Sequence, residues 1–119
     1  MLFQMQRDTG VWESVEYSSF AVGPESDKYR ISVSGFSGDT GDALTATFSA
    51  GTRVNSMKFT TPDQDNDLNP WHCHGGEEGW WFNNCARSSL NADGVACWNA
   101  YVNPYVYDVI SSRMLVKLD

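Results

Sequence analysis

The sequence predicts an α+β domain that is rich in β-strands and heavy in loops. Apolar residues at Tyr29, Ile31 and Val33 alternate with polar residues, which is the pattern of a strand with one buried face. No stretch of useful length shows the 3.6-residue period of an amphipathic helix. Glycine-rich and small polar stretches separate the apolar segments, as expected of a fold with many loops. With 119 residues the chain is at most one domain, long enough for a modest hydrophobic core.

The expected elements follow one another as short segments. In chain order they are a strand at 10–20, a turn at 23–27, a strand at 29–33, a glycine-rich loop at 35–41, a helical turn at 42–44, a surface loop at 45–54, a short strand at 57–60 and a final strand at 114–118. The alternation in the first strand has one slip. Asp42 is expected to cap the helical turn, and the final strand is expected to be partly buried on both faces. At least one tryptophan of the apolar block Trp80-Trp81-Phe82 is expected in the core.

The acidic balance of the chain excludes several kinds of partner. The formal net charge is −7 and the eight Lys and Arg residues are scattered singly, so we expect neither a nucleic-acid partner nor binding to an anionic membrane surface. No apolar run is as long as a membrane span. Residues 1–7 are too short and too polar for a signal peptide. A secreted protein carries such a leader, so if the chain is secreted we expect it to be a fragment or an incomplete gene product.

An acidic run at the centre of the chain suggests a metal site. Asp63, Asp65 and Asp67 place three carboxylates at alternate positions, and Ca²⁺ prefers hard oxygen ligands of this kind. The alternative is a solvated acidic turn, which is the usual role of a bare run of alternating aspartates. An EF-hand is excluded, because its sixth and twelfth positions require Gly and Glu but hold Leu68 and His74 here.

Zinc is a second candidate metal for the same region. His72, Cys73, His74 and Cys85 are residues of the type that ligate zinc. However, the chain has neither a C-x-x-C pair nor an H-x-x-x-H spacing, and adjacent side chains rarely converge on one tetrahedral ion. Zinc therefore ranks below calcium, and the two histidines are expected to be ordinary loop residues.

Two long motifs in the same order resemble a known family. The first is "YSSFAVGPESDKYRISVSGFSGDTGDAL" at 17–44, and the second combines "DQDND" at 63–67 with "GWWFNNCA" at 79–86. Together they resemble the fibrinogen-related domains, which are the C-terminal globular modules of fibrinogen chains, ficolins, tachylectins, angiopoietins and tenascins. The similarity resumes weakly at 111–117. The resemblance implies that residues 1–119 are a partial fibrinogen C-terminal-like domain with calcium and ligand-binding loops at 63–86, a missing N-terminal subdomain and a shortened C-terminal part.

The resemblance also implies a structural Ca²⁺ site. The aspartate side chains that hold the ion in the family correspond to Asp65 and Asp67, and the two backbone carbonyls correspond to those of Asn69 and Trp71. Asp63 would lie just outside this set. The ion would fix a polar, irregular segment and so position the neighbouring ligand loop.

The cysteines complete this expectation. The family's C-terminal disulfide corresponds to Cys73 and Cys85, which would close a loop of about a dozen residues and contribute roughly 3 kcal/mol. The chain has three cysteines, so one cannot pair within it. For Cys97 we expect burial as a small apolar residue, ahead of a bond to another chain or simple divergence.

In ficolin-like relatives a pocket beside the calcium site captures acetyl groups. The peptide bond before the second cysteine of the disulfide is cis in the family, which corresponds to Asn84–Cys85 here. The resemblance assigns the backbone donors of the pocket to Asn84, Cys85 and Ala86, and a lining side chain to Glu77. Ala86 replaces a histidine found in many relatives. The shortened interval 91–111 leaves few aromatic residues for the pocket walls, namely Trp98, Tyr101, Tyr105 and Tyr107.

Two functions compatible with this resemblance remain open. The first is a secreted, calcium-dependent lectin that binds acetylated or other surface carbohydrates in innate recognition. The second is an extracellular module that binds a receptor or matrix protein. The sequence shows no nucleophile–base pair, no G-x-S-x-G motif and no catalytic metal ligand set, so we do not expect an enzyme. A homo-oligomer is possible through regions that are absent from this chain.

Overall fold

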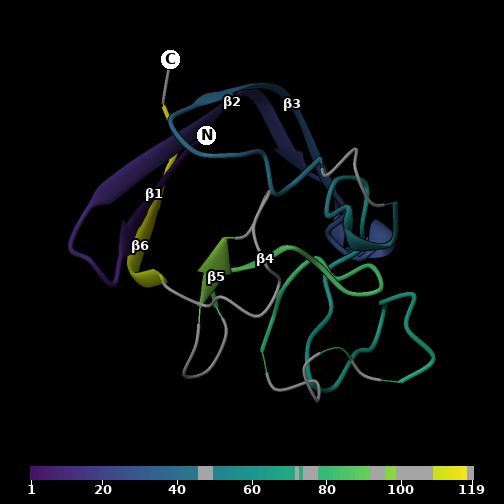
Figure 1. Ribbon diagram of the computed structural model, residues 1–119. Helices are drawn as coiled ribbons and strands as arrows, with labels where there is room; N and C mark the ends of the chain where they lie inside the picture. Colours follow the sequence, from purple (N-terminus) through teal and green to yellow (C-terminus); the bar gives the residue numbers. More distant parts are fainter. Residues whose placement is uncertain (46–49, 72, 74–77, 92–95, 99–108, 118–119) are drawn as a thin grey trace.

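The structure is a computed structural model, and it describes residues 1–45, 50–71, 73, 78–91, 96–98 and 109–117. Figure 1 shows one main sheet above a layer of loops. The elements are β1 (Leu2–Arg7), β2 (Trp12–Val22), the 3₁₀ turn η1 (Glu25–Asp27), β3 (Ile31–Gly38), the 3₁₀ turn η2 (Ala50–Thr52), β4 (Ser88–Ser89), β5 (Cys97–Trp98) and β6 (Val109–Leu115). The predicted class, β-rich with much irregular structure, is therefore confirmed.

The main sheet has four antiparallel strands in the order β3-β2-β1-β6. Its first strand, β1, was not predicted, although Phe3 and Met5 are fully buried and alternate with Gln4 and Gln6. Because β1 pairs Leu2 with Leu115 of β6, residues from the two ends of the described chain lie side by side, as Figure 1 shows. The alternation of apolar and polar residues in β1 spans too few positions to predict a strand from the sequence alone.

The side chains of β2 that face the core change phase part-way along the strand, opposite β3. Tyr17 and Phe20 both pack on the core side although they are three residues apart, and Ser18 lies between them. Opposite Ser18, Gly35 has a φ of +73°, and a Cβ there would lie 1.8 Å from the Ser18 hydroxyl oxygen. The prediction of a loop over 35–41 is thus wrong for residues 35–38, where glycine permits the strand to continue against a side chain.

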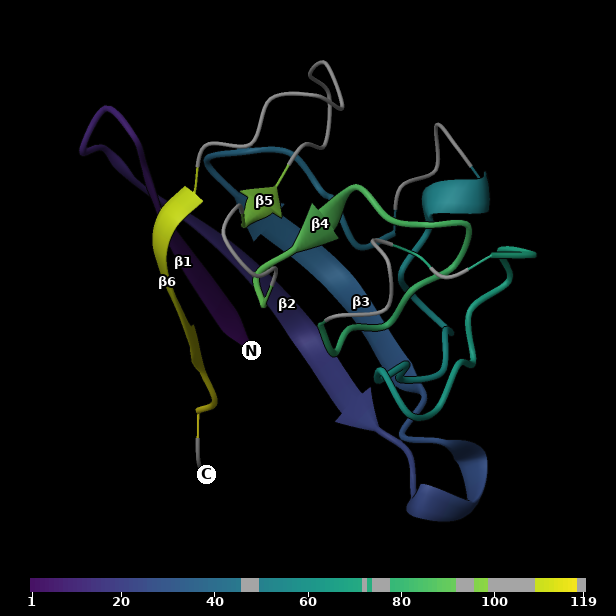
Figure 2. The same ribbon diagram turned by 90° about the horizontal axis from the view of Figure 1, so that it is seen from below.

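The second layer consists mainly of loops and covers one face of the sheet, as Figure 2 shows. It places Trp80, Phe82 and Trp98 in the core, all at most 1% exposed. The ring of Trp98 lies 5.5 Å from that of Phe3 in β1, and its Nε1–H donates to the carbonyl of Gly41 at 2.7 Å. Aromatic packing therefore joins the two layers, and it confirms the expectation that the tryptophan block contributes to the core.

Asp42 caps the turn that follows the sheet, as predicted. Its Oδ1 accepts the backbone N–H groups of Leu44 and Thr45 at 3.1 and 3.0 Å. The same oxygen accepts the hydroxyl hydrogen of Tyr17 at 2.6 Å. Burial, and next the hydrogen bond to Asp42, raise the pKa of Tyr17 above its usual value. One carboxylate thus closes the turn and satisfies a fully buried phenol.

Two other strand predictions need correction. In the segment 57–60 only Thr60 makes a ladder contact, a single bridge to Trp80, because the Phe59 N–H donates instead to the carbonyl of Lys28. The final strand is β6, which begins earlier than predicted and ends at Leu115. It lies at the edge of the sheet, so the expected burial of both faces is wrong: Leu115 is 44% exposed.

Candidate functional site

The acidic run forms a coil of three successive side-chain turns. Asp65 Oδ1 accepts the N–H of Asp67 at 3.1 Å, Asp67 Oδ1 accepts the N–H of Asn69 at 3.1 Å, and Asn69 Oδ1 accepts the N–H of Trp71 at 2.7 Å. Each bond spans two residues, which is the pattern of an Asx turn. The alternate spacing of the acidic and amide residues is therefore what allows this segment to fold locally without regular secondary structure.

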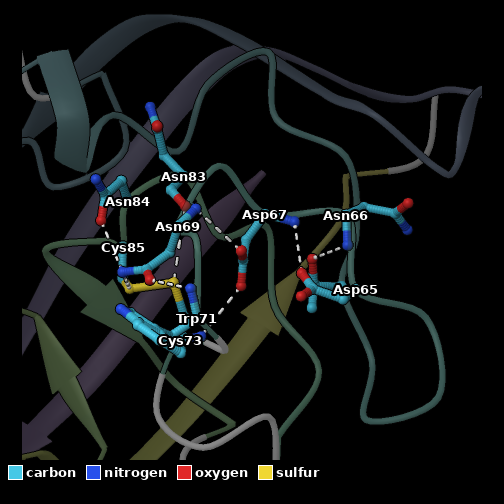
Figure 3. The surroundings of a disulfide bond; sticks show 10 residues. Asp65, Asn66, Asp67, Asn69, Trp71, Cys73, Asn83, Asn84 and Cys85 are labelled. Atoms are coloured by element: carbon cyan, nitrogen blue, oxygen red, sulfur yellow. Dashed lines mark hydrogen bonds between the residues drawn. A yellow bond between two sulfur atoms is a disulfide. The ribbon is translucent and has the colours of Figure 1, made fainter.

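A disulfide anchors the end of this coil. Cys73 and Cys85 are bonded, as the family resemblance implied, with Cα atoms 5.7 Å apart. Asp67 Oδ2 accepts the backbone N–H of Cys73 at 3.1 Å, so the two oxygens of one carboxylate hold the coil and the disulfide together. Figure 3 shows the Asp67 carboxylate directed toward the disulfide.

Side-chain and backbone bonds then join the acidic coil to the second cysteine. Asn69 Nδ2 donates to Asn84 Oδ1 at 2.8 Å, and the N–H of Leu68 donates to the carbonyl of Asn83 at 3.0 Å. Figure 3 shows Asn69 lying between the coil and Asn84. The peptide bond between Asn84 and Cys85 is cis, in agreement with the expectation. A conformational change in the acidic coil will thus directly affect the segment around Cys85, because the two are hydrogen-bonded.

The segment around Cys85 is fixed from its other side by η2 and the residues after it. Asn83 is 6% exposed, and its Nδ2 donates to the carbonyls of Ala50 and Arg53 at 2.9 and 3.0 Å. No role was predicted for Asn83. Its position beside the cysteine gave no signal, because the partners lie 30 and 33 residues earlier in the chain.

The donor set of the acidic coil fits Ca²⁺. Asp65 is exposed and Asp67 half-buried, and both offer carboxylate oxygens within a segment whose next candidates are the carbonyls of Asn69 and Trp71. A carboxylate has about four lone-pair positions, so accepting one or two N–H groups leaves capacity for a cation. Hard oxygen ligands are those that Ca²⁺ requires. These residues could hold the ion, which would supply positive charge to a strongly acidic loop.

One of the three predicted pocket donors is already used within the protein. The N–H of Asn84 donates to the carbonyl of Gly51 at 2.8 Å, so the prediction that it faces a ligand needs correction. Among the described residues, no hydrogen bond occupies the N–H of Cys85 or Ala86, and both residues are half-buried. These two N–H groups remain the candidates for binding an acceptor oxygen.

Some of the other expected site residues lie outside the described part of the chain, and others are core residues. Glu77 lies outside the described residues, as do the two histidines considered for zinc and the three tyrosines considered for the pocket walls. Within the described part of the chain, no cluster of three or more His, Cys, Asp or Glu side chains is arranged to hold a metal. Trp98 is a core residue, and Cys97 is 4% exposed, so the prediction that Cys97 is buried is confirmed.

Comparison with known proteins identifies the family. The model of the C-terminal globular domain of fibrinogen beta and gamma chains matches residues 1–106. The chain belongs to this family. Within it, the chain is 36% identical over 111 residues to protein scabrous of Drosophila melanogaster, which covers 90% of this chain and 13% of that protein. It is 42% identical over 110 residues to fibrinogen C domain-containing protein 1-A of Xenopus laevis, which covers 82% of this chain and 22% of that protein.

Solved structures of fibrinogen-like domains have the same fold. The fibrinogen-like globe domain of human ANGPTL2 aligns with a TM-score of 0.76 and 28% identity, over 93% of this chain and 54% of that one. The chain thus spans about half of a solved fibrinogen-like globe and a smaller share of the full-length relatives. The comparisons indicate no enzyme family. Among the described residues there is no helix long and apolar enough to cross a membrane.

Proposed function

We propose that this fibrinogen-like chain is an extracellular, calcium-dependent recognition module that binds acetylated carbohydrate. The observation that carries the proposal is the direct hydrogen bonding between the acidic coil and the segment around Cys85, through the Asn69–Asn84 side-chain bond at 2.8 Å. A cation held by the coil would restrain a ligand loop that is bonded to it. Extracellular location fits the disulfide, because such bonds persist in oxidising compartments.

The ion in this proposal is structural. Asp65 and Asp67 hold it with their carboxylates, and Asn69 and Trp71 contribute backbone carbonyls. Without a cation, three carboxylates within five residues repel one another and weaken the coil. Binding to the folded form alone stabilises that form by mass action. Calcium therefore acts on recognition by ordering the coil, and through it the segment around Cys85.

The ligand in this proposal is an acetyl group on a sugar. The N–H groups of Cys85 and Ala86 donate to the acetyl carbonyl oxygen, and the half-buried Ala86 side chain offers an apolar contact for the acetyl methyl group. A site of this kind distinguishes an acetylated sugar from its parent, because the parent lacks the acceptor that satisfies the two donors.

Retention on immobilised N-acetylglucosamine tests the proposal. We expect the chain to bind in Ca²⁺, to elute with EDTA, and to elute with free N-acetylglucosamine but not with glucose. Asp67→Asn should abolish retention, whereas the matched variant Asp63→Asn should leave most of it. Equal elution by glucose would exclude acetyl recognition, and retention unchanged by EDTA would exclude a role for calcium.

A second candidate is a protein-binding module, and a specific observation favours it. Leu68 lies within the acidic coil and Trp71 at its end, and they are 64% and 80% exposed. Large exposed apolar side chains beside polar groups are typical of protein contact sites, and tryptophan is common among residues that dominate such contacts. Trp71→Ala keeps the backbone carbonyl assigned to calcium. If the partner is a protein, this variant should lose partner binding and keep calcium binding.

A further inference from the structure

A cavity lies where η1 meets the segment that leads into the acidic coil. It has a volume of about 220 Å³, and the residues that line it include Glu25, Lys28, Tyr29, Phe59, Thr61 and Asp63. None of these residues belongs to the proposed calcium or acetyl site. We propose that this cavity receives a basic side chain, lysine or arginine, of a protein partner.

The backbone around the cavity is held in an unusual shape. Lys28 and Tyr29 both have a φ of +55°, in the left-handed region that side chains other than glycine rarely adopt. Hydrogen bonds maintain it: the N–H groups of Lys28 and Tyr29 donate to the carbonyls of Glu25 and Pro24 at 2.9 and 3.1 Å. The Phe59 N–H donates to the carbonyl of Lys28 at 2.8 Å. Two adjacent residues with left-handed backbone angles cost conformational energy, and strain of this kind is often found at functional sites.

The aromatic wall of the cavity is fixed by neighbours behind it. The ring of Phe59 lies 5.0 Å from that of Trp81 in an edge-to-face arrangement, and Trp81 Nε1 donates to the carbonyl of Tyr29 at 2.9 Å. A Cβ on Gly79 would lie 2.9 Å from the Phe59 ring, so glycine is what leaves room for it. Tyr29 is 47% exposed. The cavity thus has a rigid floor and an accessible aromatic side chain, which together suit a cation on an aliphatic stem.

The charges at the cavity favour a cationic ligand. Glu25 and Asp63 contribute two carboxylates against the single ammonium of Lys28, and the whole chain carries −7. Asp63 is oriented by the Thr61 hydroxyl, which donates to its Oδ1 at 2.7 Å. Glu25 and Asp63 take part in neither of the ion pairs Arg7–Glu13 and Arg30–Asp27 of the described residues. An arriving ammonium or guanidinium group would find two carboxylates available.

The size of the cavity sets the size of its occupant. Drug-sized ligands occupy pockets of about 300 Å³ or more, so a cavity of about 220 Å³ suits a single side chain rather than a larger molecule. Lys28 is itself one of the lining residues, and its positive charge opposes a cation. It therefore limits the affinity of the cavity, and its removal should improve binding of the ligand that we propose.

Titration by NMR with capped lysine tests this inference. Nα-acetyl-lysine N-methylamide, its arginine counterpart and the uncharged norleucine analogue are added separately to the labelled chain. We expect saturable shifts of the Lys28, Tyr29 and Thr61 amides with the two basic ligands only. Shifts of equal size with norleucine, or none with the basic ligands, would overturn the proposal. The titration is run in Ca²⁺ and in EDTA, with the same result expected in both. Binding that requires calcium would assign the ligand to the other site and overturn the proposal too.

Charge variants give a test of opposite signs. Glu25→Gln and Asp63→Asn should each weaken lysine binding by about 1.5- to five-fold, the range expected for one exposed ion pair. Lys28→Gln should strengthen it about two-fold or more, and Asp8→Asn, on the distant β1–β2 turn, should leave it unchanged. Weakening by Lys28→Gln as well would overturn the proposal, because removal of a like charge should favour a cationic ligand.

Discussion

Asn69 is the residue that connects the acidic coil to the ligand loop, and its removal should weaken both. Asn69→Ala deletes the acceptor of the Trp71 N–H and the donor to Asn84 Oδ1, at 2.7 and 2.8 Å. A hydrogen bond contributes about 0.5–1.5 kcal/mol net, and Asn69 is half-buried, so we expect a loss of about 1–2 kcal/mol in the free energy of unfolding. The backbone carbonyl assigned to calcium remains in place.

A double-mutant cycle isolates the bond between the two loops. Asn84→Ala removes only the acceptor Oδ1, and the double variant removes both partners. If the bond joins the loops as argued, the two losses should be non-additive by about 0.5–1.5 kcal/mol. Urea unfolding followed by tryptophan fluorescence gives the free energies, provided that the slope with denaturant is unchanged. Additive losses, or full stability in Asn69→Ala, would refute the coupling between the coil and the ligand loop.

Three further predictions concern stability. Tyr17→Phe removes the hydrogen bond to Asp42 and should lower the free energy of unfolding by about 1.5–3 kcal/mol. In the parent chain the pKa of Tyr17 is raised in the folded state, so above about pH 10 only the unfolded chain ionises at this residue and the free energy of unfolding should fall by about 1.4 kcal/mol per pH unit. Urea titrations at pH 8 and 11 should show this tyrosine contribution in the parent chain and not in the variant. Gly35→Ala should destabilise the fold by more than the about 1–2 kcal/mol that a left-handed backbone costs an alanine, because the new Cβ would clash with Ser18. Gly10→Ala is the control: Gly10 has a φ of +89° and open space around it, so this variant should show only the cost of the left-handed backbone. Equal losses in the two variants would contradict the contact with Ser18. Reduction of the disulfide, which joins residues 12 apart, should cost roughly 3 kcal/mol, and an unchanged melting temperature in reductant would contradict its role.

The sequence was sufficient for the parts of the fold that local chemistry decides. Asp42 was predicted as a cap because a short acidic side chain before Ala43 and Leu44 can accept backbone N–H groups, and it does so. Strands β2 and β3 were predicted from alternation. The predicted pairing of Cys73 with Cys85 came from the family resemblance and agrees with the structure.

Features that depend on distant partners could not be predicted. Nothing in the sequence shows that Gly35 faces Ser18 across two strands, so its glycine signalled a loop. The apparent strand at 57–60 ends as a single bridge because the Phe59 N–H finds a partner 31 residues earlier, at Lys28. The Asn84 N–H was expected to face a ligand, but it donates a hydrogen bond to the carbonyl of Gly51. In each case a contact with a residue distant in the sequence decides the structure.

The alternate spacing of the aspartates in the acidic run is compatible with two different structural roles. Alternate carboxylates suggested a metal site, and the same spacing produces the successive side-chain turns at Asp65, Asp67 and Asn69. These turns were not predicted, because the pattern of alternate carboxylates was interpreted only as a set of ligands. The turns organise the loop through hydrogen bonds of its own side chains.

Calcium titration by isothermal calorimetry tests the central claim most directly. We expect one Ca²⁺ to bind the parent chain with measurable heat and to raise its melting temperature, and EDTA to remove that gain. Asp65→Asn and Asp67→Asn each remove a charge from the ligand set and should weaken binding strongly, while Asp63→Asn, outside that set, should weaken it much less. Equal losses in all three variants would indicate diffuse acidic attraction in place of a defined site, and the absence of calcium heat in the parent chain would contradict the account.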